Sequence, residues 1–159
     1  MSVESDEFWM SKAIEAAIEA QKLDEIPIGA CLIDNAGNLL AAGGNLTRTD
    51  CDPTAHAEII VLREAAKKIG NYRLTETTLY TTIEPCAMCA GALVQARVKR
   101  LVFGAHDERF GAVETLFRIC DSSLNHQMEI TSGVSADDCR KLMQDFFRRR
   151  RSERKNISI

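Results

Sequence analysis

The chain has 159 residues, 45% of them hydrophobic, which suits one domain with a substantial core better than two domains. Its net charge is −3, so any attraction for phosphate groups must come from a local patch. The acidic N-terminus and the lack of a long apolar stretch exclude a signal peptide and a membrane span. We therefore expect a cytoplasmic protein with no membrane association, whose six cysteines stay reduced.

The N-terminal part predicts a helix followed by a β-hairpin. Ser5 is a good N-cap for the helix. Apolar residues at helical spacing follow it and form one core-facing stripe: Met10, Ala13, Ile14, Ala17 and Ile18. Two β-rich runs, 28–33 and 39–42, flank the turn-forming residues 34–38, which predicts two antiparallel strands. A polar loop over 43–52 follows.

A second helix is predicted to begin at Asp52, a good N-cap, with Pro53 in its first position, and to stop just before Gly70. His56 then falls in or just after the first turn. Glu58 lies two residues further on, and residues two apart do not share a face of a helix. These two side chains can converge only on a substrate that sits across the helix end.

The next unit is a strand over 77–83 followed by a helix that runs from Pro85 to about residue 97. If Pro85 opens this helix, Cys86 and Cys89 project from one face of its first turn. The partial positive charge at a helix N-terminus favours thiolate over thiol, and thiolate is the form that binds metals.

The C-terminal part predicts a strand over 100–103, a short helix over 112–119 and a short strand over 128–131. Ser135 and Asp138 resemble a capping box that opens a last helix. Apolar residues share one face of this helix: Cys139, Leu142, Met143, Phe146 and Phe147.

The last helix ends in a basic run. Residues 148–155 hold six basic residues and one acidic residue, so their net charge is +5 and the rest of the chain carries −8. Such a run fits a solvated helix end, because cations suit the helix dipole there, and it equally fits a contact with nucleic acid.

Strands that alternate with helices predict a three-layer α/β/α sandwich around a mixed sheet, with the hairpin as its antiparallel edge. We expect residues 1–159 to form this single domain. The polar motifs would lie at strand-to-helix junctions, where such folds usually bind ligands.

His56, Cys86 and Cys89 are three residues of metal-binding type, and three protein ligands plus water are typical of catalytic zinc. Such an ion makes hydroxide available near neutral pH, and Glu58 can collect the proton. Alone, the cysteine pair also fits a redox pair or half a zinc knuckle, and a lone His is more often packed or solvated. Together these residues match the known signature of hydrolytic zinc deaminases. Cys51 lies nearby as a bystander or an adventitious ligand.

Beyond the motif, matching segments run along nearly the whole chain: 52–59 (DPTAHAEI), 71–74 (NYRL), 84–92 (EPCAMCAGA), 102–105 (VFGA), 124–126 (LNH) and 145–147 (DFF). The first and third are typical of the cytidine deaminase-like superfamily, which includes enzymes that act on free guanine or cytosine. The later segments and the basic C-terminus favour its tRNA branch. The chain thus resembles the bacterial tRNA-specific adenosine deaminases.

The resemblance implies a five-stranded mixed sheet, a homodimer with one zinc ion per subunit, and conversion of adenosine to inosine at the wobble position of a tRNA anticodon loop. By matching position, His56, Cys86 and Cys89 bind zinc and Glu58 shuttles the proton.

The resemblance also implies substrate contacts. Asn45 matches a residue that contacts the target base, the backbone around Ala57 helps to hold that base, and Asp107 matches a residue that touches the RNA backbone beside it. Phe146 and Phe147 either face the RNA or pack in the core, since their spacing suits both.

One residue departs from the family pattern. Phe110 stands before Gly111 where the family commonly has a small or hydroxyl residue. It lies near Asp107 on the expected RNA side, so the loop contacts and the sequence preference stay open.

Two other functions remain possible at this level. A free nucleobase deaminase of the same superfamily would use the same metal, with a pocket closed by its own C-terminal segment; the arginine-rich end argues against it. A non-catalytic protein, in which zinc staples the fold and the basic tail binds RNA, would leave Glu58 without a role.

Overall fold

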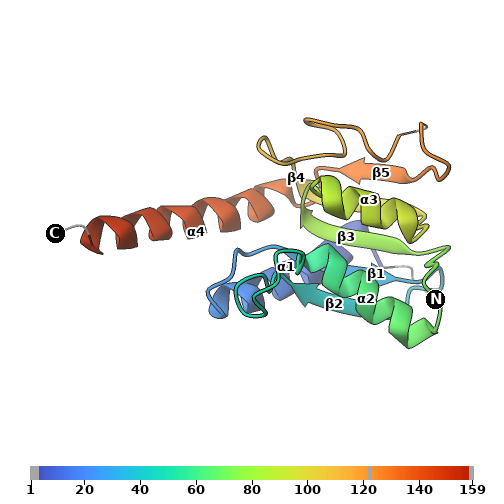
Figure 1. Ribbon diagram of the computed structural model, residues 1–159, viewed down its shortest axis with the longest axis horizontal. Coiled ribbons are helices and arrows are strands. Elements are labelled where there is room, and N and C mark those ends of the chain that lie inside the picture. Colours follow the sequence, from blue (N-terminus) through green and yellow to red (C-terminus); the bar gives the residue numbers. More distant parts are fainter. Residues whose placement is uncertain (1–3, 122, 158–159) are drawn as a thin grey trace.

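A computed structural model describes residues 4–121 and 123–157, and its centre is a sheet of five strands (Figure 1). The strands are β1 (Gly29–Ile33), β2 (Leu39–Gly44), β3 (Thr78–Ile83), β4 (Arg100–Ala105) and β5 (Glu129–Ser132). Their order is β2-β1-β3-β4-β5. β1 runs antiparallel to β2 and β3, whereas β3, β4 and β5 are mutually parallel. The sheet is therefore mixed, with the predicted hairpin at its antiparallel edge.

Helices cover both faces of this sheet. They are α1 (Asp6–Lys22), α2 (Ala57–Ile69), α3 (Ala87–Gln95) and α4 (Ala136–Ile157). One core cluster joins α2 and α3 to the sheet, and a second joins α1 and the start of α4 to the opposite face. Neighbouring strand residues alternate between the clusters: Cys31 belongs to the second and Leu32 to the first. The predicted three-layer α/β/α sandwich is confirmed.

The first helix begins as expected, because the Ser5 hydroxyl accepts a hydrogen bond of 3.1 Å from the backbone N–H of Phe8. It then lies unusually close to β1 at Gly29, where a Cβ atom would collide with the backbone of Ala13 and Ala17. Cys31 and Cys139 are buried in the core on this side of the sheet, and for Cys139 this agrees with its predicted place on the apolar face of the last helix.

Both helices that carry the motif begin later than predicted. The start of α2 at Asp52 is wrong, since Asp52 instead accepts hydrogen bonds from the N–H and hydroxyl of Thr54 and forms a turn. An Asp side chain competes for nearby backbone N–H groups in this way. His56 is the N-cap of α2. In α3 the N-cap is Cys86, so Pro85 precedes the helix and does not open it.

The helix predicted over 112–119 is also wrong, because these residues form turns and irregular structure. The backbone N–H groups of Val113, Glu114 and Thr115 all donate to the carboxylate of Glu84, at 3.1, 2.8 and 3.0 Å. The chain wraps around a buried acceptor that lies about thirty residues earlier, so local helix propensity does not decide its conformation.

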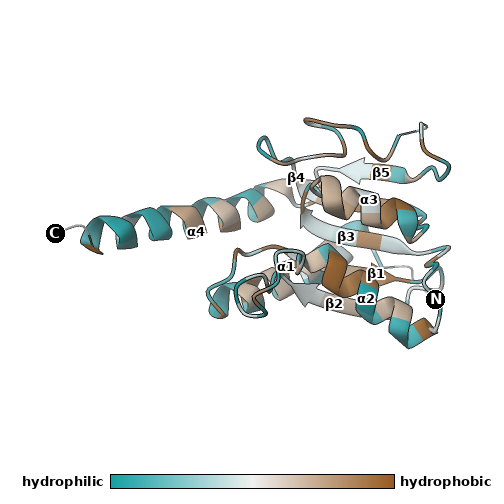
Figure 2. Cartoon of the chain, in the orientation of Figure 1, coloured by the Kyte–Doolittle hydropathy of each residue, from teal (hydrophilic) through white to brown (hydrophobic). Residues whose placement is uncertain are grey.

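The last helix packs on the sheet only near its start and then extends away from the domain (Figure 1). Its outer half is strongly hydrophilic and contains the basic run 148–155 (Figure 2). Ser135 precedes the helix with φ 53°, not with the extended backbone of an ordinary N-cap residue. Among the residues that the structure describes, no helix is both long and apolar enough to cross a membrane.

Candidate metal centre and active site

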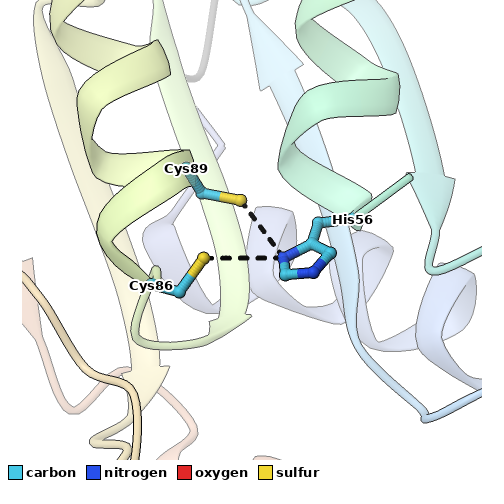
Figure 3. A group of neighbouring side chains, drawn as sticks. All are labelled: His56, Cys86 and Cys89. Atoms are coloured by element: carbon cyan, nitrogen blue, oxygen red, sulfur yellow. Dashed lines mark hydrogen bonds between the residues drawn. The ribbon is translucent and has the colours of Figure 1, made fainter. Parts of the chain in front are cut away.

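His56, Cys86 and Cys89 converge between the N-termini of α2 and α3 (Figure 3). The Nδ1 atom of His56 lies 3.6 Å from the Sγ of Cys86 and 3.5 Å from the Sγ of Cys89. The three ligand atoms lie within 4.8 Å of one another. A tetrahedral zinc ion with ordinary bond lengths separates its nitrogen and sulfur ligands by about 3.6 Å. The donor set and its spacing fit a zinc ion.

The later helix starts explain this convergence. His56 and Cys86 are both N-cap residues with extended backbone, at φ −75°, ψ 153° and φ −73°, ψ 176°. Their side chains therefore leave the chain before the helix begins, while Cys89 projects from the first turn of α3. Two helix N-termini face the cluster, and their partial positive charge favours thiolates.

Hydrogen bonds among the three side chains shift their pKa values. A hydrogen bond from Cys89, helped by one from His56, lowers the pKa of the Cys86 thiol to about 4 against the effect of burial. The hydrogen bond with Cys86, together with burial, raises the pKa of Cys89. The neighbouring Cys86 also raises the pKa of His56. A bound cation would replace these shared protons, because metal ligands must be deprotonated.

Glu58 lies beside the cluster in the first turn of α2 and is only 3% exposed. Its carboxylate accepts a hydrogen bond of 2.7 Å from the hydroxyl of Thr81 on β3. Because His56 precedes the helix and Glu58 lies inside it, the two side chains need not share a helical face. Both line the same cavity, which resolves the geometric difficulty that their spacing raises.

This cavity has a volume of about 390 Å³, which is in the usual range for small-ligand sites. Its lining combines the polar residues of the cluster with an apolar wall and residues from two distant segments. The lining residues are Ile26, Ile28, Asn45, His56, Glu58, Ile83, Glu84, Cys86, Asp107, Arg109, Phe110, Met143 and Phe147.

The residues expected to contact substrate also reach this cavity or its edge. Asn45 is buried, and its Oδ1 accepts a hydrogen bond of 3.2 Å from the backbone N–H of Ala57. Asn45 thus fixes the backbone at the start of α2. Asp107 lines the cavity, and its Oδ1 accepts hydrogen bonds from the N–H groups of Arg109 and Phe110.

The two neighbouring phenylalanines of α4 differ. Phe146 is 3% exposed, and the guanidinium groups of Arg149 and Arg150 lie over its ring. Phe147 is 39% exposed and lines the cavity. Cys51 is exposed, and its Sγ lies 3.7 Å from the carbonyl oxygen of Arg48, outside the three-ligand group.

The motif analysis overlooked Glu84, which organises one side of the cavity. Its buried carboxylate accepts hydrogen bonds from the N–H of Asp107, from the N–H groups of residues 113–115 and from the Thr115 hydroxyl. Burial raises its pKa, but the Thr115 hydroxyl and the N–H groups outweigh burial, so the net pKa is lowered. A signal was present, since a charged residue follows the buried strand β3 directly.

Thr81 was overlooked as well. It belongs to the fully buried part of β3, where its hydroxyl needs a partner, and Glu58 is that partner. No pattern local to Thr81 marks it, because the two residues are 23 positions apart.

Comparisons with known proteins identify the family of this chain. Residues 4–151 match the family model described as MafB19-like deaminase. The tRNA-specific adenosine deaminase of Haemophilus influenzae is 52% identical, with 96% of this chain and 88% of that protein covered. A solved structure from studies of A-to-I editing by tRNA:A34 deaminases at the wobble position matches with a TM-score of 0.81 at 40% identity, covering 85% of this chain and 98% of that one.

A guanine deaminase from Nitrosomonas europaea also has a TM-score of 0.81, covering 92% of this chain and 86% of its own. Its identity is 24%, so this likeness concerns the fold alone. The family match and the sequence identity to the tRNA-specific adenosine deaminases show membership of a family as well as a shared fold. The chain belongs to the MafB19-like deaminase family, alongside the tRNA-specific adenosine deaminases.

Proposed function

We propose that this protein hydrolyses adenosine to inosine at the wobble position of a tRNA anticodon, with zinc as its cofactor. The observation that carries the proposal is the convergence of three zinc-type ligands and the buried Glu58 on one cavity. The relatives named tRNA-specific adenosine deaminase support the choice of substrate.

His56, Cys86 and Cys89 would hold one zinc ion per subunit. When bound, zinc lowers the pKa of a water molecule so that hydroxide is available near neutral pH. Glu58 would take the proton of that water and pass it to the ring nitrogen of adenine as the oxygen bonds to C6. It would then carry the proton of the hydroxyl group added at C6 to the departing amine, so that one water is consumed and one ammonia released. The Thr81 hydroxyl holds Glu58 in place for both transfers.

The target base would enter the cavity from a single-stranded loop. An anticodon base can be splayed out at modest unstacking cost and read by its edges. Asn45 and the backbone around Ala57 would hold the base, and Asp107 would touch the RNA backbone next to it. The basic run 148–155 on α4 would supply attraction for phosphates that the net charge of −3 does not give.

We further propose a homodimer that acts in the cytoplasm, in which residues 1–159 form one deaminase domain. The helices α2 and α3 support a dimer, because an apolar groove of about 410 Å³ runs along them. Ile59, Leu62 and Tyr72 are among its lining residues. Light scattering tests this part, and a monomer active at full rate would contradict it.

The deciding experiment incubates the zinc-loaded protein with an anticodon stem-loop that carries adenosine at the wobble position. Parallel reactions contain free adenine, guanine and cytosine, and mass spectrometry detects the products. We expect inosine in the RNA alone. A product from a free base alone would place the protein among the nucleobase deaminases.

A matched pair of variants tests the chemistry. We expect Glu58→Gln to keep its zinc but to lose about 10²- to 10⁴-fold in kcat, the usual contribution of a general acid–base group. Glu64→Gln on the exposed side of α2 is the control and should keep full activity. Normal turnover by Glu58→Gln would remove Glu58 from the proposed mechanism.

A further inference from the structure

Phe110 is a large apolar side chain held in solvent at the edge of the active-site cavity. It is 66% exposed, and it lines the same cavity as His56 and Glu58. Isolated exposed apolar residues are common and need no explanation by themselves. The position of Phe110 and the hydrogen bonds of its loop set it apart from such residues.

The backbone around Phe110 is fixed by hydrogen bonds at both ends of the loop tip. The Oδ1 of Asp107 accepts from the N–H of Phe110 at 3.2 Å, and the carbonyl of Asp107 accepts from the N–H of Gly111 at 3.0 Å. The N–H of Asp107 donates in turn to the buried Glu84 at 3.1 Å. The backbone that carries the ring is therefore held at the edge of the cavity.

The neighbours of Phe110 are residue types that are common on surfaces that bind nucleic acids. Phe147, a second partly exposed aromatic residue, lines the same cavity, as does Arg109. Arg109 also lines an adjoining groove with Arg151, which belongs to the basic run of α4. Aromatic faces next to cationic groups are the usual elements of single-strand binding, in which bases stack and phosphates are neutralised.

We propose that Phe110 is a stacking platform for the nucleotide next to the target adenosine, and that it helps to determine which anticodon loops are accepted. This inference rests on the proposed function. When the target base leaves the stack and enters the cavity, its neighbour loses a stacking partner. The exposed ring at the cavity edge replaces that partner.

The test compares Phe110→Ala, Phe110→Tyr and wild type on three stem-loops: one intact, one abasic on the 5′ side of the target and one abasic on the 3′ side. On the intact loop we expect Phe110→Ala to lose about 5- to 100-fold in kcat/KM, mainly through KM, which is the range that aromatic stacking supplies. Phe110→Tyr should retain wild-type behaviour. On one abasic loop the difference between Phe110→Ala and wild type should shrink to about twofold or less.

Phe117→Ala is the matched control, because Phe117 is also exposed but lies outside the cavity lining. It should not discriminate among the three stem-loops. A loss in Phe110→Ala that persists unchanged on both abasic loops, or no loss at all, overturns the inference. So does a changed oligomeric mass of Phe110→Ala, which would assign the ring to a subunit interface. Inosine formation by wild type on the intact loop is scored first, so a failure of the proposed function is distinguished from a failure of this inference.

Discussion

The metal centre and the surface around the cavity mouth differ in how their side chains are held. His56 and Cys86 are short residues that leave the backbone at helix starts, and Cys89 is buried in the first turn of α3. The surface beyond the cavity instead consists of long arginine side chains on α4, a helix that extends past the sheet. The proposed chemistry depends on a few atoms in the cavity, whereas the proposed attraction for RNA is spread over several arginine side chains. Loss of one atom should therefore abolish the first and only weaken the second.

The sharpest test of this contrast is removal of the metal. We expect dialysis against a chelator to abolish turnover and added zinc to restore it, because in the proposed mechanism zinc makes hydroxide available. Cys89→Ser should lose bound zinc by mass spectrometry, whereas Cys51→Ser should keep it. Activity that persists in the metal-free protein would remove zinc from the mechanism.

Glu84 connects the two regions, so its substitution should affect both stability and RNA binding. Glu84→Ala leaves several buried N–H groups without an acceptor, and we expect a loss of about 2–4 kcal/mol in the free energy of unfolding. KM for the stem-loop should rise as well, because the loop that carries Asp107 loses its anchor. Urea denaturation and steady-state kinetics measure both effects. Thr115→Val, which removes one donor, should show a smaller change of about 1 kcal/mol; an equal change would mean that Glu84 is not the organising group.

The ion pair between Asp6 and Arg100 lies away from both regions and gives a reference value for one stabilising interaction. Hydrogen bonds from Arg100 hold the pKa of Asp6 below its ordinary value of 3.8. A lowered folded-state pKa stabilises the fold above the unfolded-state value, and this contribution disappears as the pH falls through the folded-state pKa. At pH 7 we expect Asp6→Asn to lose about 1–2 kcal/mol, as for a partly buried charged hydrogen bond.

Thermal unfolding of Asp6→Asn and wild type over a pH series checks this. Their difference in stability should shrink steadily below pH 3.8. A difference that stays constant into strong acid would show that the pair contributes no charge-dependent stability.

The smallest effect is expected on α4. Arg151→Gln should raise KM by only about two- to fivefold and reduce the slope of log KM against log salt concentration by less than one, because one phosphate contact is lost. Glu153→Gln is the control of opposite charge and should lower KM slightly. A change in kcat for Arg151→Gln would mean that α4 acts on the chemistry itself.

The sequence correctly indicates that His56, Cys86 and Cys89 come together and that Glu58 lies beside them. Few residue types bind zinc or move protons, so their spacing in a motif is informative. It places the helix starts less well. Asp52 and Pro53 have the residue preferences of a helix start, yet the carboxylate of Asp52 is used by Thr54 in a preceding turn. Because α2 and α3 begin later than predicted, His56 and Cys86 become N-cap residues.

The segment 112–119 shows why other parts could not be predicted. Its conformation is set by the buried carboxylate of Glu84, about thirty positions earlier, and no local pattern carries that information. The partnership of Thr81 with Glu58 is equally non-local. The layered fold, by contrast, follows from alternating strands and helices that each show their own period in the sequence.

Glu84 stands two positions before Cys86, with Pro85 between them, so the anchor of the loop and a metal ligand share one short piece of stiff backbone. The base of the loop therefore has little freedom to change without disturbing the ligand. The tip, residues 108–110, is exposed, so we expect it to accept other side chains without loss of the fold. An engineer who wishes to alter which RNAs are accepted should randomise these three positions and leave Asp107 and Gly111 untouched.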